Sequence, residues 1–180
     1  MIVKNTKKIG LSRKDRKKMK TAVIYYSLEG NMEFVAKKIG GNHAADLIRL
    51  IPKKEYPTGK VSKYVWGGKS ATFGERPKLV NETIDLEKYD TLIIGSPVWA
   101  GTFTPPVHTF LHDYSISGKN IILVATSMSG EAEKCLAKMK DYLQDNNIME
   151  TFQFVEPLHQ KDAGLDEKIR QIRKRIGDET

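Results

Sequence analysis

The feature that most constrains the fold is a regular alternation between two hydrophobic periods. β-rich apolar runs occur at 21–26, 45–51, 90–99 and 119–127, and a β-rich run that alternates with polar residues occurs at 149–157. Segments with apolar residues three or four positions apart follow these runs, at 31–41, 104–114, 130–146 and 163–176. Strands that alternate with helices favour a parallel sheet covered by helices on both faces. The pattern therefore predicts a three-layer α/β sandwich with a five-stranded parallel sheet.

The strands are expected to differ in position within the sheet. The runs at 21–26, 90–99 and 119–127 are the most uniformly apolar, as expected for central strands covered on both faces. The run at 149–157 alternates and predicts an edge strand. Residues 52–83 are the least regular part, with a short helix expected around 58–70. Three aromatic residues in this part could line a ligand pocket, pack on the core or contact a second subunit: Tyr64, Trp66 and Phe73.

The positive charge of the chain is confined to its first residues. The formal net charge is +8, and residues 1–20 carry nine basic and one acidic side chain, a difference of +8. The remaining 160 residues carry 21 of each. We therefore expect a disordered basic extension at 1–19 and one domain at 20–180, with no nucleic acid or membrane as partner of the domain. An arm that binds nucleic acid or lipid is the alternative for the extension.

Two further observations concern the class of protein. No run of 18 apolar residues occurs, so no transmembrane helix is expected. Cys135 is the single cysteine, which excludes an internal disulfide and favours the cytoplasm. His108 and His112 have the spacing of two metal ligands on a helix, but we expect them on an exposed face and predict no metal site.

Parallel sheets of this kind bind ligands beyond the carboxyl ends of their strands, so three loops are candidates. The first, Ser27–Met32, is small and polar and leads into a helix, where backbone N–H groups can bind an anion or simply cap the helix. It matches neither a Walker A loop nor GxGxxG. The second, 95–106, carries Trp99, which suits a flat aromatic ligand or else packs on the core or a dimer partner. The third, 125–131, is again small and polar.

Together these loops resemble those of the flavodoxin family. "VIYYSLEGNMEFVAKKI" is similar to the family's phosphate loop, and "YDTLIIGSPVWAGTFTPPVHTFL" is similar to its flavin-ring loop. The resemblance covers about Lys20 to Ile176. It implies a flavodoxin-like sheet with strand order 2-1-3-4-5 and noncovalently bound FMN.

The resemblance also implies the binding residues, by position. The phosphate would be surrounded by hydroxyl and backbone N–H groups of Ser27, Leu28, Glu29, Gly30, Asn31 and Met32. The isoalloxazine ring would lie along Pro97, Val98, Trp99, Ala100, Gly101 and Thr102, with Trp99 as the stacking ring. The pyrimidine side and ribityl chain would meet Thr126, Ser127, Met128, Ser129 and Gly130. No side chain is placed as a catalytic acid or base.

Three departures from the family pattern bear on function. Glu29 and Met32 stand where the phosphate loop typically has threonines, the third loop lacks an aromatic residue, and the domain is neutral where electron-shuttle flavodoxins are acidic. We expect an FMN-binding redox protein, either an electron-transfer module or an NAD(P)H- or quinone-linked oxidoreductase. The alternative is a non-redox interaction protein with the same fold and weakened FMN binding. Both a monomer and a homodimer are compatible with the sequence.

Overall fold

The computed structural model describes residues 20–57, 74–81, 83–159 and 161–178. The expected extension at 1–19, the helix around 58–70 and the aromatic residues Tyr64, Trp66 and Phe73 lie outside these ranges. The strands are β1 (Thr21–Tyr25), β2 (Asp46–Arg49), β3 (Thr91–Trp99), β4 (Thr102–Phe103), β5 (Asn120–Ser127) and β6 (Asn147–Val155). The helices of more than one turn are α1 (Asn31–Ile39), α3 (Pro105–Asp113), α4 (Glu133–Asp141) and α5 (Leu165–Arg175).

The sheet has the predicted order. Five parallel strands are arranged β2-β1-β3-β5-β6, which is the expected 2-1-3-4-5 when the parallel strands alone are numbered. β1 and β3 are buried along most of their length, whereas three of the four residues of β2 are exposed and β6 alternates. The expected central strands and the expected edge strand are therefore confirmed.

A short antiparallel strand, β4, was not predicted. It pairs with the end of β3, Val98 opposite Phe103 and Trp99 opposite Thr102, within the stretch 95–106 that was expected to be a loop. The two residues between the strands, Ala100 and Gly101, both have positive φ, 49° and 71°. Two such residues make the tight turn that matches the twist of a hairpin. An alanine rarely adopts this conformation, which is why the sequence pattern did not indicate the hairpin.

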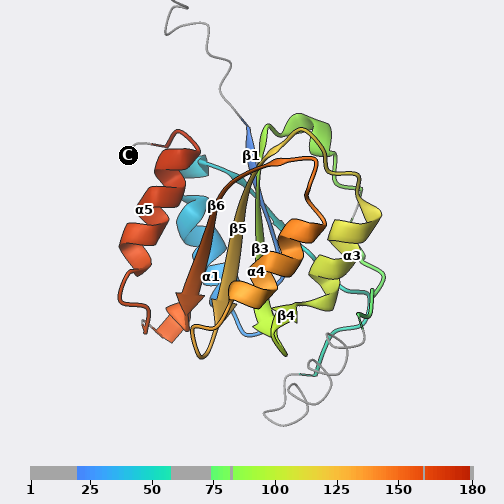
Figure 1. Ribbon diagram of the computed structural model, residues 1–180, viewed down its shortest axis with the longest axis horizontal. Coiled ribbons are helices and arrows are strands. Elements are labelled where there is room, and N and C mark those ends of the chain that lie inside the picture. The colour runs from blue at the N-terminus through green and yellow to red at the C-terminus, as the bar shows by residue number, and fades with distance from the viewer. Residues whose placement is uncertain (1–19, 58–73, 82, 160, 179–180) are drawn as a thin grey trace, which may run out of the picture.

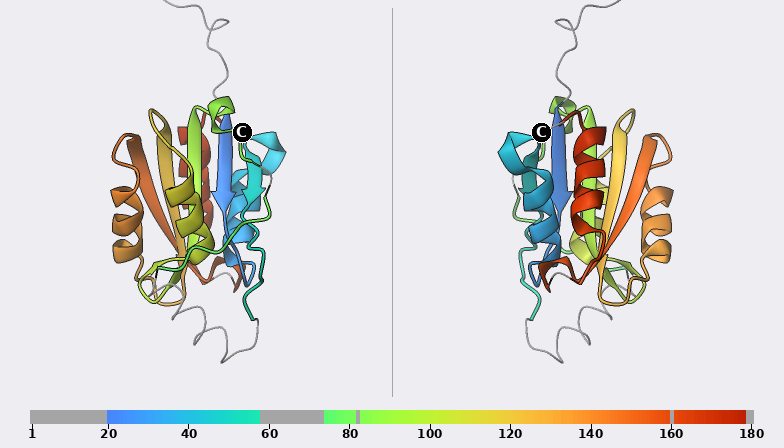
Figure 2. Two further views of the ribbon diagram at one scale, coloured as in Figure 1. Left: turned by 90° about the vertical axis from the view of Figure 1, so that its right-hand side faces the viewer. Right: turned by 90° about the vertical axis from the view of Figure 1, so that its left-hand side faces the viewer.

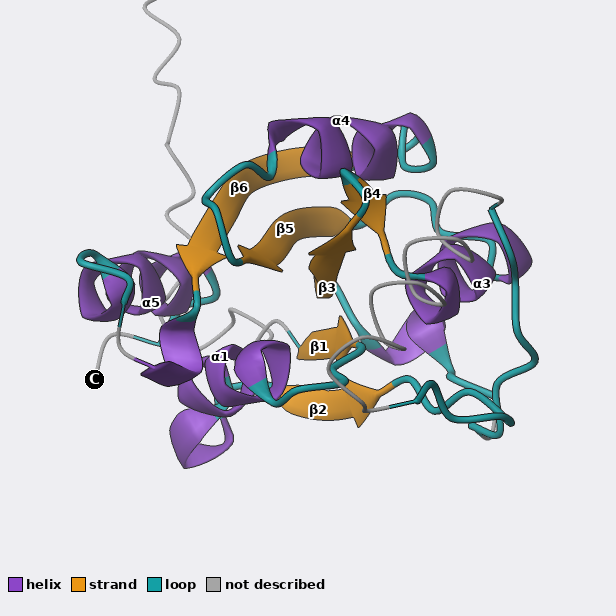
Figure 3. Cartoon of the chain, turned by 90° about the horizontal axis from the view of Figure 1, so that it is seen from below, coloured by secondary structure: helices purple, strands orange, loops and turns teal. Residues whose placement is uncertain are grey.

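The helices cover both faces of the sheet. α1 and α5 lie on one face, and α3 and α4 lie on the other (Figures 1 and 3). Each face has its own apolar core: Val35 and Ile172 pack with Ile93 on the first, and Phe110 and Met139 with Leu92 on the second. The parallel strands point the same way, so their carboxyl ends gather at one end of the domain (Figure 2).

Some predicted boundaries were wrong. The helix expected at 130–146 extends only over Glu133–Asp141, and the strand expected at 149–157 begins at Asn147. The Asn146 side chain accepts a hydrogen bond from Lys119 N (3.0 Å) and donates one to Ile116 O (2.7 Å). These contacts hold Asn146 beside the start of β5, and β6 starts at the next residue, two positions before the expected start. Within the described ranges, no helix is both long and apolar enough to cross a membrane.

Candidate functional site

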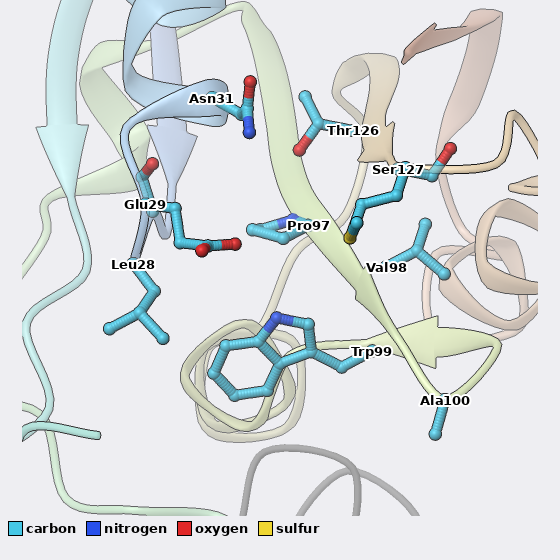
Figure 4. A pocket seen from close by; sticks show the side chains of 11 residues that line it. Leu28, Glu29, Asn31, Pro97, Val98, Trp99, Ala100, Thr126 and Ser127 are labelled. Atoms are coloured by element: carbon cyan, nitrogen blue, oxygen red, sulfur yellow. The ribbon is translucent and has the colours of Figure 1, made fainter. Parts of the chain in front are cut away.

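A cavity of about 330 Å³ lies at the carboxyl ends of β1, β3 and β5 (Figure 4). Its walls come from the three loops singled out by the sequence. All eleven described residues that line it were predicted binding positions: Ser27, Leu28, Glu29, Asn31, Pro97, Val98, Trp99, Ala100, Thr126, Ser127 and Met128. The fold thus brings together segments that are up to about one hundred residues apart in the chain.

The first loop offers hydrogen-bond donors to the cavity. Ser27 is buried, and its hydroxyl oxygen has no hydrogen-bond partner among the described residues. A buried hydroxyl without a partner is costly unless something else satisfies it. The next residues turn through Gly30, whose φ is 90°, into α1. The first N–H groups of a helix lack intrahelical acceptors, and in the described part of the chain no side chain caps those of α1. This donor set fits a phosphate group.

The Glu29 side chain points into the cavity. Its carboxylate lies on the cavity side of the first loop and is directed toward Pro97 (Figure 4). A carboxylate therefore faces the cavity. The Asn31 side chain has a different role, because its Oδ1 accepts a hydrogen bond from Leu158 N (3.1 Å) and so ties the first loop to the segment after β6.

The second loop presents Trp99 between two tyrosines. The Trp99 ring is edge-to-face with Tyr56 (5.2 Å between centroids, 81°) and with Tyr26 (5.8 Å, 90°). Such perpendicular contacts favour a single orientation of the indole ring. The indole nitrogen faces the side of the cavity where Glu29 and Pro97 lie (Figure 4). Burial raises the pKa of Tyr56 to about 12, with a further rise from Glu75, so that this hydroxyl stays protonated at neutral pH.

Tyr26 and Tyr56 were missed by the sequence analysis. In the sequence Tyr26 ends an apolar run, and Tyr56 lies in the irregular segment 52–83. Their aromatic type was visible, but nothing in the local pattern indicated that both would pack on Trp99.

The third loop is held by its own hydrogen bonds. The Ser127 hydroxyl accepts a bond from Gly130 N (3.0 Å), which closes the turn at the end of β5. Thr126 is buried and directs its hydroxyl into the cavity (Figure 4). Met128 is 60% exposed. Trp99 is the one aromatic residue among the described lining residues, as expected from the third loop's composition.

Six predicted positions do not line the cavity: Gly30, Met32, Gly101, Thr102, Ser129 and Gly130. Gly30, Gly101 and Gly130 serve the turns through their positive φ. Met32 is fully buried, and its side chain packs on Gly95 between α1 and the sheet. Its side chain therefore belongs to the core, and only its backbone N–H could face a phosphate. Thr102 lines a second cavity.

That second cavity, of about 270 Å³, lies between α3 and α4 and contains His108. His108 was expected on an exposed face, but it is half-buried. Its Nε2 lies 2.9 Å from Tyr142 Oη, and its ring packs edge-to-face on Phe103. Burial lowers its pKa, more than hydrogen bonds to nearby backbone carbonyls raise it. His112 is exposed and pairs with Asp113. No cluster of three or more metal-ligating side chains occurs in the described part of the chain.

Arg49 was also missed. It is the last residue of β2 and donates from Nη2 to Ser27 O (2.8 Å) and from Nη1 to Glu33 Oε2 (3.1 Å). In the sequence it was simply a polar position within a predicted strand. The expected strand order already places β2 beside β1, but the reach of the Arg49 side chain to Ser27 is seen only in the tertiary structure.

The sheet, its helices and this cavity define the class: a doubly wound α/β protein with a mononucleotide-type site at the ends of its strands. The flavodoxin family model matches residues 20–163. The chain belongs to the flavodoxin family, and FMN is the cofactor that this membership assigns.

Solved structures agree with the fold. A candidate flavoprotein from Bacteroides eggerthii is 24% identical, with a TM-score of 0.70 over 88% of this chain and 98% of that one. A flavoprotein from Lactobacillus acidophilus, solved in complex with FMN, is 20% identical, with a TM-score of 0.64 over 83% and 97%. Oxidised flavodoxin 2 from Bacillus cereus is 15% identical, with a TM-score of 0.53 over 89% and 99%. No curated protein matches the chain.

Proposed function

We propose that this protein binds FMN noncovalently in the 330 Å³ cavity and acts as a redox flavoprotein. The observation that carries the proposal is the cavity itself, whose described lining residues all come from the carboxyl ends of β3 and β5, the turns after β1, β3 and β5, and the first residue of α1. The buried hydroxyl of Ser27, which has no hydrogen-bond partner among the described residues, supports placing the phosphate at the first loop. When bound, FMN would supply the one- or two-electron chemistry, and the protein would supply orientation and electrostatics.

Within this proposal the chain's own residues have separate tasks. Ser27 and the N–H groups at the start of α1 would hold the phosphate. Trp99, oriented by Tyr26 and Tyr56, would stack on the ring system. Thr126 would donate to the ribityl or pyrimidine oxygens. The 17 predicted positions stand as the proposed site, with Met32 contributing through its backbone alone.

The proposal leaves two redox roles, an electron-transfer module and an NAD(P)H- or quinone-linked oxidoreductase. Negative charge favours docking to basic redox partners, and residues 21–180 carry equal numbers of acidic and basic side chains. Among the described residues, the third-loop side of the cavity carries Met128, 60% exposed, and no aromatic cover, which favours access by a second substrate. Rapid bleaching of the bound flavin by NADH or NADPH alone would support the oxidoreductase, and no bleaching would support the shuttle.

The proposed location is the cytoplasm, and the proposed boundary between the extension and the domain is at residue 19. The cytoplasmic location is supported by the single cysteine, Cys135, because one cysteine allows no internal disulfide. The boundary at residue 19 is supported by the family match, which starts at residue 20.

A second candidate is a non-redox interaction protein with weakened FMN binding. The Glu29 carboxylate in the cavity and the withdrawal of Met32 into the core favour it. The absorption spectrum of the purified protein, before and after addition of FMN, separates the two. A flavin spectrum that stays with the protein through gel filtration supports the first proposal. A protein that remains colourless with excess FMN contradicts it.

Trp99→Ala is expected to weaken FMN binding by about tenfold or more, because stacking of an aromatic ring on a heterocycle contributes roughly 1–3 kcal/mol. Fluorescence titration of FMN measures the change. Trp99→Phe, which keeps an aromatic ring, should retain most of the affinity. An unchanged dissociation constant in the alanine variant would refute the stacking role.

Glu29→Thr is expected to tighten FMN binding by several-fold to about tenfold, since it removes a like charge from the cavity and adds a hydroxyl donor. Glu29→Gln separates these effects, because it removes the charge at nearly constant shape. Riboflavin, which lacks the phosphate, should respond little to either change. Equal affinities of wild type and both variants for FMN would show that the Glu29 charge does not oppose the phosphate.

A further inference from the structure

We infer that Arg49 positions the phosphate end of the site, an inference that rests on the proposed FMN binding. The guanidinium bridges two acceptors of the first loop and helix α1: Ser27 O at 2.8 Å and Glu33 Oε2 at 3.1 Å. Arg49 does not itself line the cavity. It contacts the backbone of the residue whose buried hydroxyl is the proposed phosphate donor.

The backbone around Arg49 is held on both sides. Arg49 is in register with Tyr25 at the end of β1, and Leu50 N donates to Tyr25 O (2.7 Å). The Asn81 side chain donates to Arg49 O (2.7 Å) and accepts from Ile51 N (2.8 Å). The long arginine side chain therefore starts from a defined point beside the first loop, and its planar group can satisfy two acceptors at once.

The contact with Ser27 O sets the direction of a neighbouring donor. A trans peptide is planar, so its C=O and the following N–H point in opposite directions. With the Ser27 carbonyl held toward Arg49, the Leu28 N–H is directed away from Arg49. A cation bound to the carbonyl also polarises this peptide and strengthens the N–H as a donor.

Arg49 also changes the charge balance of the loop. Glu29 and Glu33 place two carboxylates in the first loop and the first turn of α1, and FMN phosphate would add a charge of about −1.5 to −2. Lys37 pairs with Glu33 at 2.6 Å on the outer side of α1. Arg49, unlike Lys37 in its described contacts, also binds the backbone of the first loop, at Ser27 O. Because its side chain is 42% exposed, its effect on a ligand should weaken with added salt.

The test compares FMN with riboflavin in Arg49→Met and Arg49→Lys. At low salt Arg49→Met should weaken FMN by roughly tenfold while changing riboflavin by no more than about twofold, because only FMN carries the phosphate. High salt should shrink the FMN effect. Arg49→Lys should recover part of the affinity, since it keeps the charge but cannot bridge both acceptors. Lys53→Met, which removes an exposed charge four residues after the end of β2, is the matched control and should behave as wild type.

Other outcomes would overturn the inference. An equal loss of FMN and riboflavin in Arg49→Met would show a general effect on the fold, and unchanged FMN affinity would show no role. If Arg49→Met does not fold, Arg49→Lys decides. The inference requires that its affinity for FMN, divided by its affinity for riboflavin, is lower than in wild type. If wild type binds neither flavin, the proposed function itself fails, and this inference fails with it.

Discussion

Lys168→Met is expected to lower the free energy of unfolding by about 3–5 kcal/mol, because it leaves a buried carboxylate without its cation. The Asp162 side chain is only 2% exposed, and Lys168 Nζ lies 2.8 Å from its Oδ2. The same carboxylate accepts from Val155 N and Gly164 N, both at 2.9 Å. Through these bonds the pair joins β6, the following loop and α5. Urea denaturation followed by circular dichroism measures the change.

The pH dependence follows from the direction of the Asp162 pKa. Burial by itself would raise this pKa, but the Lys168 ammonium and the two backbone N–H groups more than offset it, so the pKa lies below its usual value. The pair therefore stabilises the fold above the unfolded-state pKa of about 3.9, and this stability is lost as the pH falls through the lower folded-state pKa. The cost of Lys168→Met should accordingly shrink in acid.

Two control variants make this prediction specific. Arg175→Met breaks an ion pair with Glu150 whose side chains are 54% and 32% exposed, and should cost no more than about 1 kcal/mol. Asp162→Asn added to Lys168→Met should restore part of the stability, because it removes the uncompensated charge. A loss in Lys168→Met no larger than that in Arg175→Met would contradict the assignment of Asp162 as a buried, cation-dependent carboxylate.

Met32→Ala is expected to lower the free energy of unfolding by about 2–5 kcal/mol, the usual cost of emptying a buried methionine position. Met32 is fully buried and fills the space above Gly95, where an added Cβ would lie 2.8 Å from Met32 Sδ. Met32→Leu, which nearly conserves volume, should cost less than about 1.5 kcal/mol.

Gly95 supplies a test of this contact in a double-mutant cycle. Gly95→Ala should destabilise the wild-type protein by crowding Met32 and should cost clearly less in the Met32→Ala background, with a coupling of about 0.5–3 kcal/mol. Additive effects would mean that the two side chains do not share this space. The contact with Gly95 would then not explain why Met32 stands where the family's phosphate loop typically has a threonine.

The strand and helix periods were sufficient for the architecture. Each apolar run such as 21–26 reports burial on both faces of a strand, and the loops after three of these runs carry small polar residues suited to an anion. Because the carboxyl ends of parallel strands meet at one edge, the location of the cavity followed from the order of elements alone. The family resemblance of the first two loops then pointed to FMN, and the family model agrees.

Contacts between distant segments were not predictable in this way. Arg49 reaches Ser27 across 22 positions, Tyr56 meets Trp99 across 43, and Met32, an expected apolar position of α1, packs on Gly95 across 63. Glu29 could have faced solvent or cavity, and only the path of the loop directs it inward (Figure 4). Periodicity reports which residues are buried, whereas the direction of a side chain depends on neighbours supplied by other strands. The pattern of residues thus specified the sheet and the place of the site, and the packed chain decided its charge, its ring orientation and its supporting contacts.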